Sequence, residues 1–185
     1  GQNPARQAAI KSGIPKEKTA YVVNQVCGSG LRSIASGFQS IKAGDSKIVV
    51  AGGQECMSLA PHAIHLRDGK KLGDTEITDT MIKDGLWDAF HGYHMGVTAE
   101  NVSTKFQVTR EDQDKFALKS QQKAISAQKE NKFKDEIVNF KIKSKKAEIN
   151  FNKDEHPREG INIESLSKLK PVFKKDGTVT AGNYS

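Results

Sequence analysis

The chain has 185 residues, of which 36% are hydrophobic, so it can bury a core. No stretch approaches the roughly 18 consecutive apolar residues of a membrane-spanning helix. The first residues also lack the apolar core of a signal peptide, but the chain opens on Gly1 in a phrase typical of the middle of a domain, so the N-terminus does not report on targeting. Two cysteines are too few for a disulfide framework and form no CxxC pair, which favours a reducing compartment.

The positive charge is concentrated in the second half of the chain. The formal net charge is +7, yet residues 1–100 carry 11 basic and 10 acidic side chains, whereas residues 101–185 carry 18 basic and 12 acidic side chains. This excess predicts an anionic partner, or otherwise a solvated lysine-rich face. A small phosphorylated ligand fits better than nucleic acid, because the lysines alternate with acids and few aromatic side chains are available to stack on bases.

Residues 19–53 predict a strand, a turn, a helix and a second strand. Residues 19–26 (TAYVVNQV) and 47–53 (KIVVAGG) have the β-branched, apolar composition of buried strands. Between them, apolar side chains follow the spacing of one helix face, at Leu31, Ile34, Ala35, Phe38 and Ile41. Gly44 and Asp45 predict the end of this helix. A short helix between two apolar strands indicates a parallel pair in an α/β layer.

Residues 56–97 lack the apolar spacing of a helix or strand, which predicts a long irregular segment. Helical spacing returns from Thr98. Thr109 predicts the N-cap of a further helix that runs to about Lys129. Alternation over residues 138–143 predicts a half-exposed strand, and residues 148–151 predict a second one.

Cys27 lies at the predicted junction of strand and helix. Unpaired backbone N–H groups at a helix N-terminus favour a negatively charged sulfur, and the amide of Cys27 itself is placed to donate to an oxyanion. Gly28 and Gly30 let the backbone turn and let a ligand approach. These features suit acyl transfer through a covalent thioester. The alternative is an inert packing cysteine, which is how we interpret Cys56.

Three segments carry a resemblance to a known family. The segment NQVCGSGLRSIASGFQSIKAGDSKIVVAGGQECMS resembles the nucleophile segment of the thiolases. GLWDAFHGYHMGVTAENVSTKFQVTREDQD resembles their loop domain, and KLKPVFKKDGTVTAGNYS resembles the return to the core. The resemblance covers essentially the whole chain and is closest to the short-chain biosynthetic branch, the acetyl-CoA C-acetyltransferases.

The resemblance implies an α/β fold, a partial layered thiolase core with an α+β loop domain. Residues 1–56 would be part of the N-terminal core, residues 57–178 the loop domain with coenzyme A-binding segments, and residues 179–185 the start of the next core segment. It also implies that Cys27 is the nucleophile that carries the acyl group. Residues that would line the acyl, pantetheine and nucleotide parts of the site are Leu86, His94, Met95, Arg158, Ser165, Phe173, Ala181, Gly182 and Ser185.

Several of these residues have a simpler interpretation when taken alone. His94 could be a hydrogen-bonded structural histidine and Met95 a core residue. Arg158 and Ser165 could be ordinary surface residues. Tyr184 departs from the family, which usually has alanine there, and this departure could narrow the pantetheine channel.

The family's remaining catalytic groups are a histidine in a GHP phrase, a second cysteine in a CxG phrase and an asparagine phrase. None of these phrases occurs in the 185 residues. We therefore predict that the chain is a fragment with little turnover of its own. The resemblance implies acetyl-CoA and acetoacetyl-CoA as substrates, no cofactor, no metal, no nucleic acid and no membrane. It further implies a homodimer or homotetramer at full length and a cytoplasmic location, with mitochondria or peroxisomes as alternatives. Alternative functions are a broad-range 3-ketoacyl-CoA thiolase and a non-catalytic coenzyme A-binding truncation.

Overall fold

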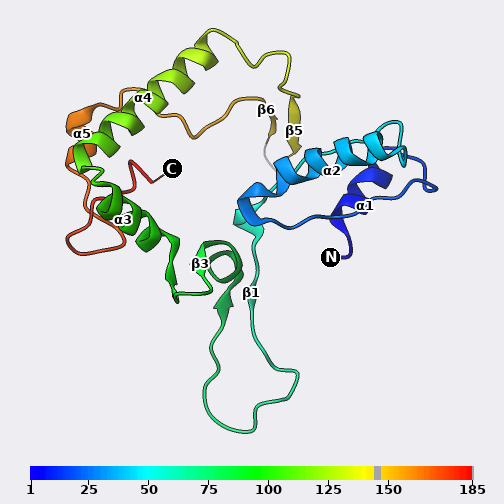
Figure 1. Cartoon of the computed structure of the whole chain (residues 1–185), viewed down its shortest axis with the longest axis horizontal. Coiled ribbons are helices and arrows are strands. Elements are labelled where there is room, and N and C mark those ends of the chain that lie inside the picture. Colours follow the sequence, from blue (N-terminus) through cyan, green and yellow to red (C-terminus); the bar gives the residue numbers. More distant parts are fainter. Residues whose placement is uncertain (144–146, 185) are drawn as a thin grey trace. The chain divides into compact units, whose positions relative to one another are not determined.

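The computed structural model describes residues 1–143 and 147–184. It divides into two compact units, the N-terminal unit (residues 1–85) and the C-terminal unit (residues 86–185), and each is described by itself. Figure 1 shows the chain, with its helices and several of its strands labelled. The predicted domain boundaries at residues 56 and 178 stay a prediction.

The N-terminal unit contains two α-helices and one short pair of strands. Its elements are α1 (Pro4–Lys11), the 3-10 turn η1 (Val26–Gly28), α2 (Ser29–Ala43), the 3-10 turn η2 (Met57–Leu59), β1 (His62–Ala63) and β2 (Thr78–Asp79). The strands β1 and β2 are antiparallel, and the loop between them extends well away from them in Figure 1. The π-helical turn η3 (Ile82–Leu86) leads out of this unit.

Helix α2 confirms the predicted helix, and its sequence explains both its end and its packing. Gly44 ends it in the left-handed conformation (φ 83°), which glycine adopts without a steric penalty. Gly37 allows the chain to pass close by, since a Cβ on Gly37 would lie only 2.9 Å from the Val49 side chain. The Ser33 hydroxyl also donates to the Gly52 carbonyl at 2.9 Å. Residues 47–53 therefore run along α2, as a strand would run beside its crossover helix.

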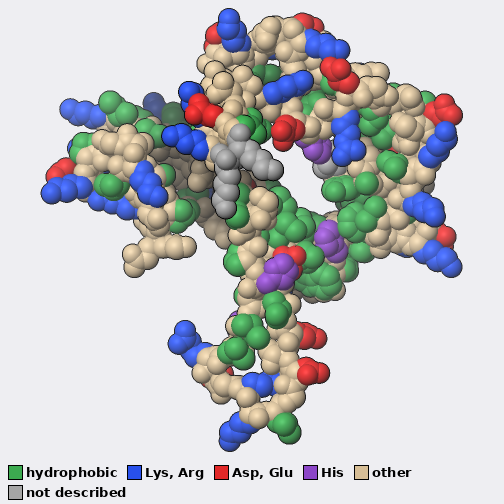
Figure 2. Space-filling view, turned by 180° about the vertical axis from the view of Figure 1, so that it is seen from behind, with side chains coloured by type: hydrophobic (Ala, Val, Ile, Leu, Met, Phe, Trp, Pro, Cys, Tyr) green, Lys and Arg blue, Asp and Glu red, His purple; other side chains and the backbone are tan. Residues whose placement is uncertain are grey.

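The prediction that residues 19–26 and 47–53 are buried, paired strands is wrong for this chain. Neither segment forms a ladder among the described residues, and Ile48 and Val50 are 88% and 82% exposed. A strand requires a hydrogen-bonded neighbour and a covered face, and residues 1–85 provide neither. The apolar face of α2 is open for the same reason. Figure 2 shows many such hydrophobic side chains at the surface rather than enclosed.

The C-terminal unit is built on two consecutive helices. Its elements are β3 (Trp87–Asp88), β4 (Tyr93–His94), α3 (Met95–Phe106), α4 (Arg110–Lys129), β5 (Phe140–Lys143), β6 (Glu148–Phe151) and α5 (Ile163–Ser167). The pairs β3–β4 and β5–β6 are antiparallel, and Phe140 lies opposite Phe151 in the second pair. Both faces of β5 are exposed, so the predicted half-buried face is absent.

Side-chain caps fix the starts of the helices in this unit. Thr109 accepts a hydrogen bond from the Asp112 amide, which confirms the predicted N-cap of α4. His94 caps α3, so that helix starts three residues before the predicted Thr98. Helix α5 was not predicted, although Asn162 and Ser165 form a reciprocal capping box at its start.

The core of the C-terminal unit lies where the return segment, residues 171–184, meets α3, α4 and α5. The buried residues there are Gly96, Glu100, Asp114, Ala117, Leu166, Val179 and Thr180. Figure 1 shows the return segment in orange and red beside the green helix α3 and the orange helix α5. Since several of these buried residues are polar, hydrogen bonding as well as apolar packing organises this core.

Candidate active site

Cys27 lies in an exposed turn that leads directly into α2. It is the middle residue of η1, and Gly28 is the N-cap of α2. Its side chain is exposed, so a ligand can reach the sulfur. The structure thus confirms that Cys27 lies in a turn before a helix start, whereas the strand predicted before it is absent, and its catalytic role stays a prediction.

The backbone before Cys27 is strained and is held by neighbouring side chains. Val26 has φ 49°, in the left-handed region that a β-branched residue rarely adopts. Its amide donates to Asn24 Oδ1 at 3.0 Å, and its carbonyl accepts from the Ser29 hydroxyl at 2.7 Å. The Gln25 amide donates to the same hydroxyl at 2.8 Å. These bonds keep the turn sharp and so keep the sulfur of Cys27 at the head of α2.

In the C-terminal unit, His94 and Met95 lie where β4 ends and α3 begins. His94 Nδ1 accepts a hydrogen bond from the Gly96 amide at 3.0 Å, which satisfies one of the unpaired N–H groups of α3. The His94 ring stacks on Phe173, with ring centroids 4.8 Å apart and an interplanar angle of 18°. The Phe173 ring lies against Gly96, where a Cβ would be 2.2 Å from the ring. Two predicted site residues, His94 and Phe173, are therefore in direct contact.

Phe173 also connects this pair to the end of the return segment. The Tyr184 ring meets Phe173 edge-on, with centroids 6.1 Å apart. Ala181, which is exposed, and Gly182 form the turn just before Tyr184. Gly182 is required there, because a Cβ would lie 2.5 Å from the Leu166 side chain. The turn at residues 181–182 is thus packed against α5 on one side and leads to the aromatic group on the other.

The other predicted residues lie on separate elements. Leu86 ends η3 and is half-buried. Arg158 lies between β6 and α5 with an exposed side chain, and its amide donates to Gln121 Oε1 at 2.9 Å. The Ser165 hydroxyl donates to the Asn162 carbonyl at 2.7 Å within the capping box, so it already has a structural role. Ser185 lies outside the described residues.

The polar residues that hold the return segment were not predicted from the sequence. The Glu100 carboxylate, 3% exposed, accepts the amides of Thr178 and Val179, each at 2.8 Å. Burial opposes its ionisation, but the N–H groups of Val179 and Thr178, the Thr178 hydroxyl and the charge of Lys174 outweigh it and lower the pKa of Glu100. The sequence near Glu100 carries no signal for this contact, since its partners lie far along the chain.

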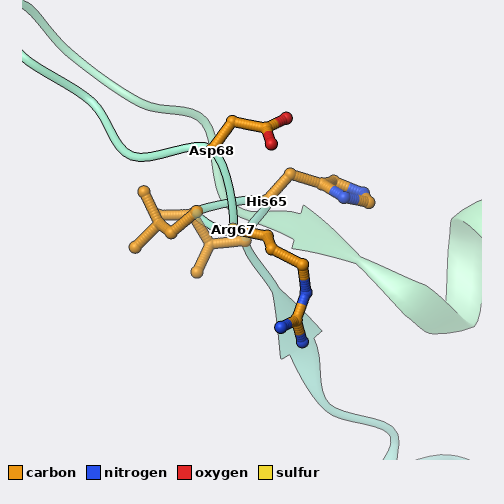
Figure 3. Close-up of a pocket in the computed structure, with 5 residues that line it drawn as sticks. His65, Arg67 and Asp68 are labelled. Atoms are coloured by element: carbon orange, nitrogen blue, oxygen red, sulfur yellow. The ribbon is translucent and has the colours of Figure 1, made fainter.

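A surface hollow of about 530 Å³ occurs in the loop between β1 and β2 and is lined by residues 64–68. Figure 3 shows that the side chains of His65, Arg67 and Asp68 point in different directions and do not converge on a common point. None of the predicted site residues lines it. This hollow therefore does not form part of the candidate site.

Among residues 1–143 and 147–184, no three histidine, cysteine or acidic side chains are grouped closely enough to hold a metal ion. None of the helices there combines the length and the apolar character that spanning a bilayer requires.

Known proteins match this chain over its whole length. The family model described as "Thiolase, N-terminal domain" matches residues 1–185. An acetyl-CoA acetyltransferase of Rhizobium meliloti (strain 1021) is 61% identical over 185 residues, which are 100% of this chain and 47% of that protein. One of Shinella zoogloeoides is 58% identical over the same shares. The chain thus spans about half the length of the curated relatives it matches.

Solved structures show the same likeness. The crystal structure of the Bacillus anthracis acetyl-CoA acetyltransferase superposes with a TM-score of 0.95 and 45% identity, covering 100% of this chain and 47% of that one. The human mitochondrial 3-ketoacyl-CoA thiolase gives a TM-score of 0.91 and 43% identity, covering 96% and 45%. The predicted α/β, thiolase-like fold class is therefore confirmed.

Proposed function

The chain belongs to the thiolase family, and on that premise we propose that it supplies the nucleophile of an acetyl-CoA C-acetyltransferase. This enzyme condenses two molecules of acetyl-CoA to acetoacetyl-CoA and coenzyme A, and runs in both directions. The observation that carries the proposal is the exposed position of Cys27 in the turn before α2, in a chain that matches acetyl-CoA acetyltransferases over its whole length.

The first half-reaction forms a thioester on Cys27. The Cys27 thiol gives up its proton and the sulfur attacks the carbonyl carbon of acetyl-CoA. The bond from that carbon to the coenzyme A sulfur breaks, and coenzyme A takes up that proton and leaves as the thiol. Backbone N–H groups at the start of α2 would stabilise the oxyanion that forms during the attack. The strained turn at Val26 supports this role, because it fixes the sulfur relative to those groups.

The second half-reaction forms the carbon–carbon bond. A second acetyl-CoA loses an α-proton, its carbanion attacks the acetyl carbonyl, and the bond to the Cys27 sulfur breaks to release acetoacetyl-CoA. The proton transfers need groups of the kind that the family carries in its GHP and CxG phrases, which do not occur in these 185 residues. We propose that these groups lie outside the 185 residues and that this chain alone has little or no turnover.

The coenzyme A part of the substrate would contact the C-terminal unit. In this proposal His94, Met95 and Leu86 line the acyl end of the site, while Phe173, Ala181, Gly182 and Ser185 line the pantetheine arm. Arg158 and Ser165 would lie near the nucleotide. The contact between His94 and Phe173 supports this grouping, and the excess of basic residues after residue 100 suits the phosphates of coenzyme A.

The remaining features of the proposal follow the same branch of the family. The substrates are acetyl-CoA and acetoacetyl-CoA, the site uses no cofactor or metal, and the partners include neither nucleic acid nor membrane. The full-length protein would be a cytoplasmic homodimer or homotetramer that supplies a precursor of mevalonate.

The experiment compares Cys27 and Cys56 within the full-length protein. Both are exposed, so a difference between them reports chemistry rather than access. Incubation with acetyl-CoA followed by mass spectrometry should find the acetyl group on Cys27. Cys27→Ala should lower turnover by roughly 10³-fold or more, whereas the matched control Cys56→Ala should keep it. Acetylation of Cys56, or undiminished turnover in Cys27→Ala, would overturn the proposal.

A second candidate is a broad-range 3-ketoacyl-CoA thiolase. It is favoured by the TM-score of 0.91 with the human mitochondrial enzyme, at an identity close to that with the acetyltransferase. Chain-length preference depends on the shape of the pocket, so kcat/KM for acetoacetyl-CoA and for a long-chain 3-ketoacyl-CoA separates the two. Preference for the long chain would replace the first proposal with this one.

A non-catalytic coenzyme A-binding chain is the alternative from another class. In that case iodoacetamide should label Cys27 no faster than Cys56. Faster labelling of Cys27 that acetyl-CoA suppresses would exclude this alternative.

A further inference from the structure

We propose that Asn183 is a positioning residue, which holds the turn formed by Ala181 and Gly182 in the shape that the pantetheine arm of coenzyme A requires. The inference rests on the proposed function, because that proposal assigns the turn to substrate binding. It concerns a side chain that would not itself touch the reacting atoms.

The side-chain amide of Asn183 joins both ends of the turn. Its Oδ1 accepts the Thr180 amide at 2.8 Å, and its Nδ2 donates to the Thr178 carbonyl at 3.1 Å. Its backbone amide donates to the Thr180 carbonyl at 3.1 Å. One side chain thus closes the segment that leads from residue 178 through the turn.

The same amide group fixes the turn to α4. Asn183 Nδ2 also donates to Asp114 Oδ1 at 2.9 Å, and Asp114 is only 2% exposed. The other oxygen of Asp114 accepts from Arg110 Nε at 2.8 Å. Arg110 Nη2 then donates to the carbonyls of Leu166 and Leu169, at 2.7 and 3.0 Å. A continuous set of hydrogen bonds therefore runs from α5 through α4 to the turn.

This arrangement needs an asparagine and no close substitute. Position 183 must accept from one amide and donate to a carboxylate and a carbonyl, and only a primary amide of this length offers both. Aspartate would place a second carboxylate next to buried Asp114, and alanine would leave that carboxylate short of a donor. Both losses are costly in a buried network.

The expected consequence is a loss of substrate binding rather than of chemistry. The turn lies in the C-terminal unit, whereas the nucleophile Cys27 lies in the N-terminal unit. A misplaced turn weakens contacts that substrate and transition state share, so KM rises while kcat is retained. A residue that merely stabilises the fold would lower the amount of active enzyme and leave KM unchanged.

The test uses the full-length protein at a temperature at which every variant is folded. Asn183→Ala and Asn183→Asp should each raise the KM for acetyl-CoA about 10-fold, with kcat within about 3-fold of the parent. The matched control Asn101→Ala removes an exposed amide that donates to the Tyr93 hydroxyl, and it should leave KM unchanged.

An exchange of partners provides a rescue. In the double variant Asn183→Asp with Asp114→Asn, residue 114 becomes the donor and residue 183 the acceptor, so their hydrogen bond is restored. The KM of this variant should fall part of the way back from that of Asn183→Asp alone, since the contact to the Thr178 carbonyl remains lost.

The outcomes separate this inference from the function on which it rests. If the parent protein does not acetylate Cys27, the proposed function is wrong and the inference falls with it. If the parent acetylates Cys27 but Asn183→Ala keeps the parent KM, or lowers kcat alone, the inference alone is wrong. Failure of the exchange to lower KM would also overturn it.

Discussion

The two units of the chain differ in how far they bury their apolar side chains. Gly37 is the only buried residue among residues 1–85, all of which the structure describes, and the apolar face of α2 is open, with Leu31 76% exposed. The C-terminal unit encloses Leu166, Val179 and Ala117 together with buried carboxylates. The difference shows that an amphipathic helix forms from local signals, but its apolar face is buried only where another segment of the chain is available to cover it.

The largest effect on stability is expected from a comparison of two leucine-to-alanine variants, one in each unit. Leu166→Ala should lower the free energy of unfolding of the C-terminal unit by about 2–5 kcal/mol, because Leu166 is 1% exposed and its removal leaves a cavity. Leu31→Ala should change stability by less than about 0.5 kcal/mol. Urea denaturation measures both, with far-UV circular dichroism for the whole chain and fluorescence of the single tryptophan, Trp87, for the C-terminal unit. Similar losses in the two variants would contradict the contrast between the units.

A pair of glycines sharpens the comparison, because each is the second residue of a helix. A Cβ on Gly96 would lie 2.2 Å from the Phe173 ring, whereas a Cβ on Gly30 would have no neighbour within 4 Å. Gly96→Ala should therefore destabilise the C-terminal unit by about 1–3 kcal/mol. Gly30→Ala gains helix propensity and should be neutral or stabilising by up to about 1 kcal/mol. Urea midpoints of the two variants test this, and a stable Gly96→Ala would show that Phe173 can move aside without cost.

Local signals account for the elements that could be predicted from the sequence. Helix α4 was predicted at both ends because Thr109, the acids after it and the apolar spacing are all close in sequence. Helix α5 was missed because it has only five residues and its capping box pairs Asn162 with a serine rather than with an acid or amide. Residues 47–53 have the composition of a buried strand, and composition cannot report whether a partner strand and a cover are present.

In the candidate site, too, only local features could be predicted from the sequence. The position of Cys27 in a turn before a helix was predicted from the residues next to it. His94 and Phe173 were assigned to one site only through the family resemblance, and their stacking was not predicted, since no periodicity relates two such distant positions. The bond between Asn183 and Asp114, 69 positions apart, was not foreseen at all. Long-range polar contacts depend on the fold as a whole, so a single sequence carries little signal for them.

The buried carboxylate of Glu100 makes stability depend on pH. Its pKa in the folded chain is lowered from the ordinary 4.5. The ionised group therefore stabilises the C-terminal unit above pH 4.5, and this contribution is lost as the pH falls through the lowered pKa. Glu100→Gln should lower the free energy of unfolding by roughly 1–3 kcal/mol at pH 7 and should flatten its decline in acid.

The measurement is urea denaturation followed by Trp87 fluorescence at pH 7 and at several values below 4.5. Glu111→Gln is the control, because Glu111 is exposed on α4 and pairs with Lys115 at the surface. It should change stability by less than about 0.5 kcal/mol and leave the acid profile as in the parent. An identical acid profile in Glu100→Gln would assign the pH dependence to other groups.

The smallest expected effect concerns helix capping, in which α2 differs from the helices of the C-terminal unit. Helices α3, α4 and α5 each have a side-chain N-cap, as α1 has in Asn3, whereas α2 begins at Gly28 without one. Thr109→Ala should destabilise the C-terminal unit by about 1 kcal/mol, because the Asp112 amide loses its acceptor, and Thr109→Ser should restore most of that loss. Gly28→Ala removes no such bond and should cost only a few tenths of a kcal/mol. If urea midpoints show equal losses for Thr109→Ala and Gly28→Ala, the side-chain cap of Thr109 adds no stability of its own, and the packing around Leu166 would have to account for the stability of the C-terminal unit.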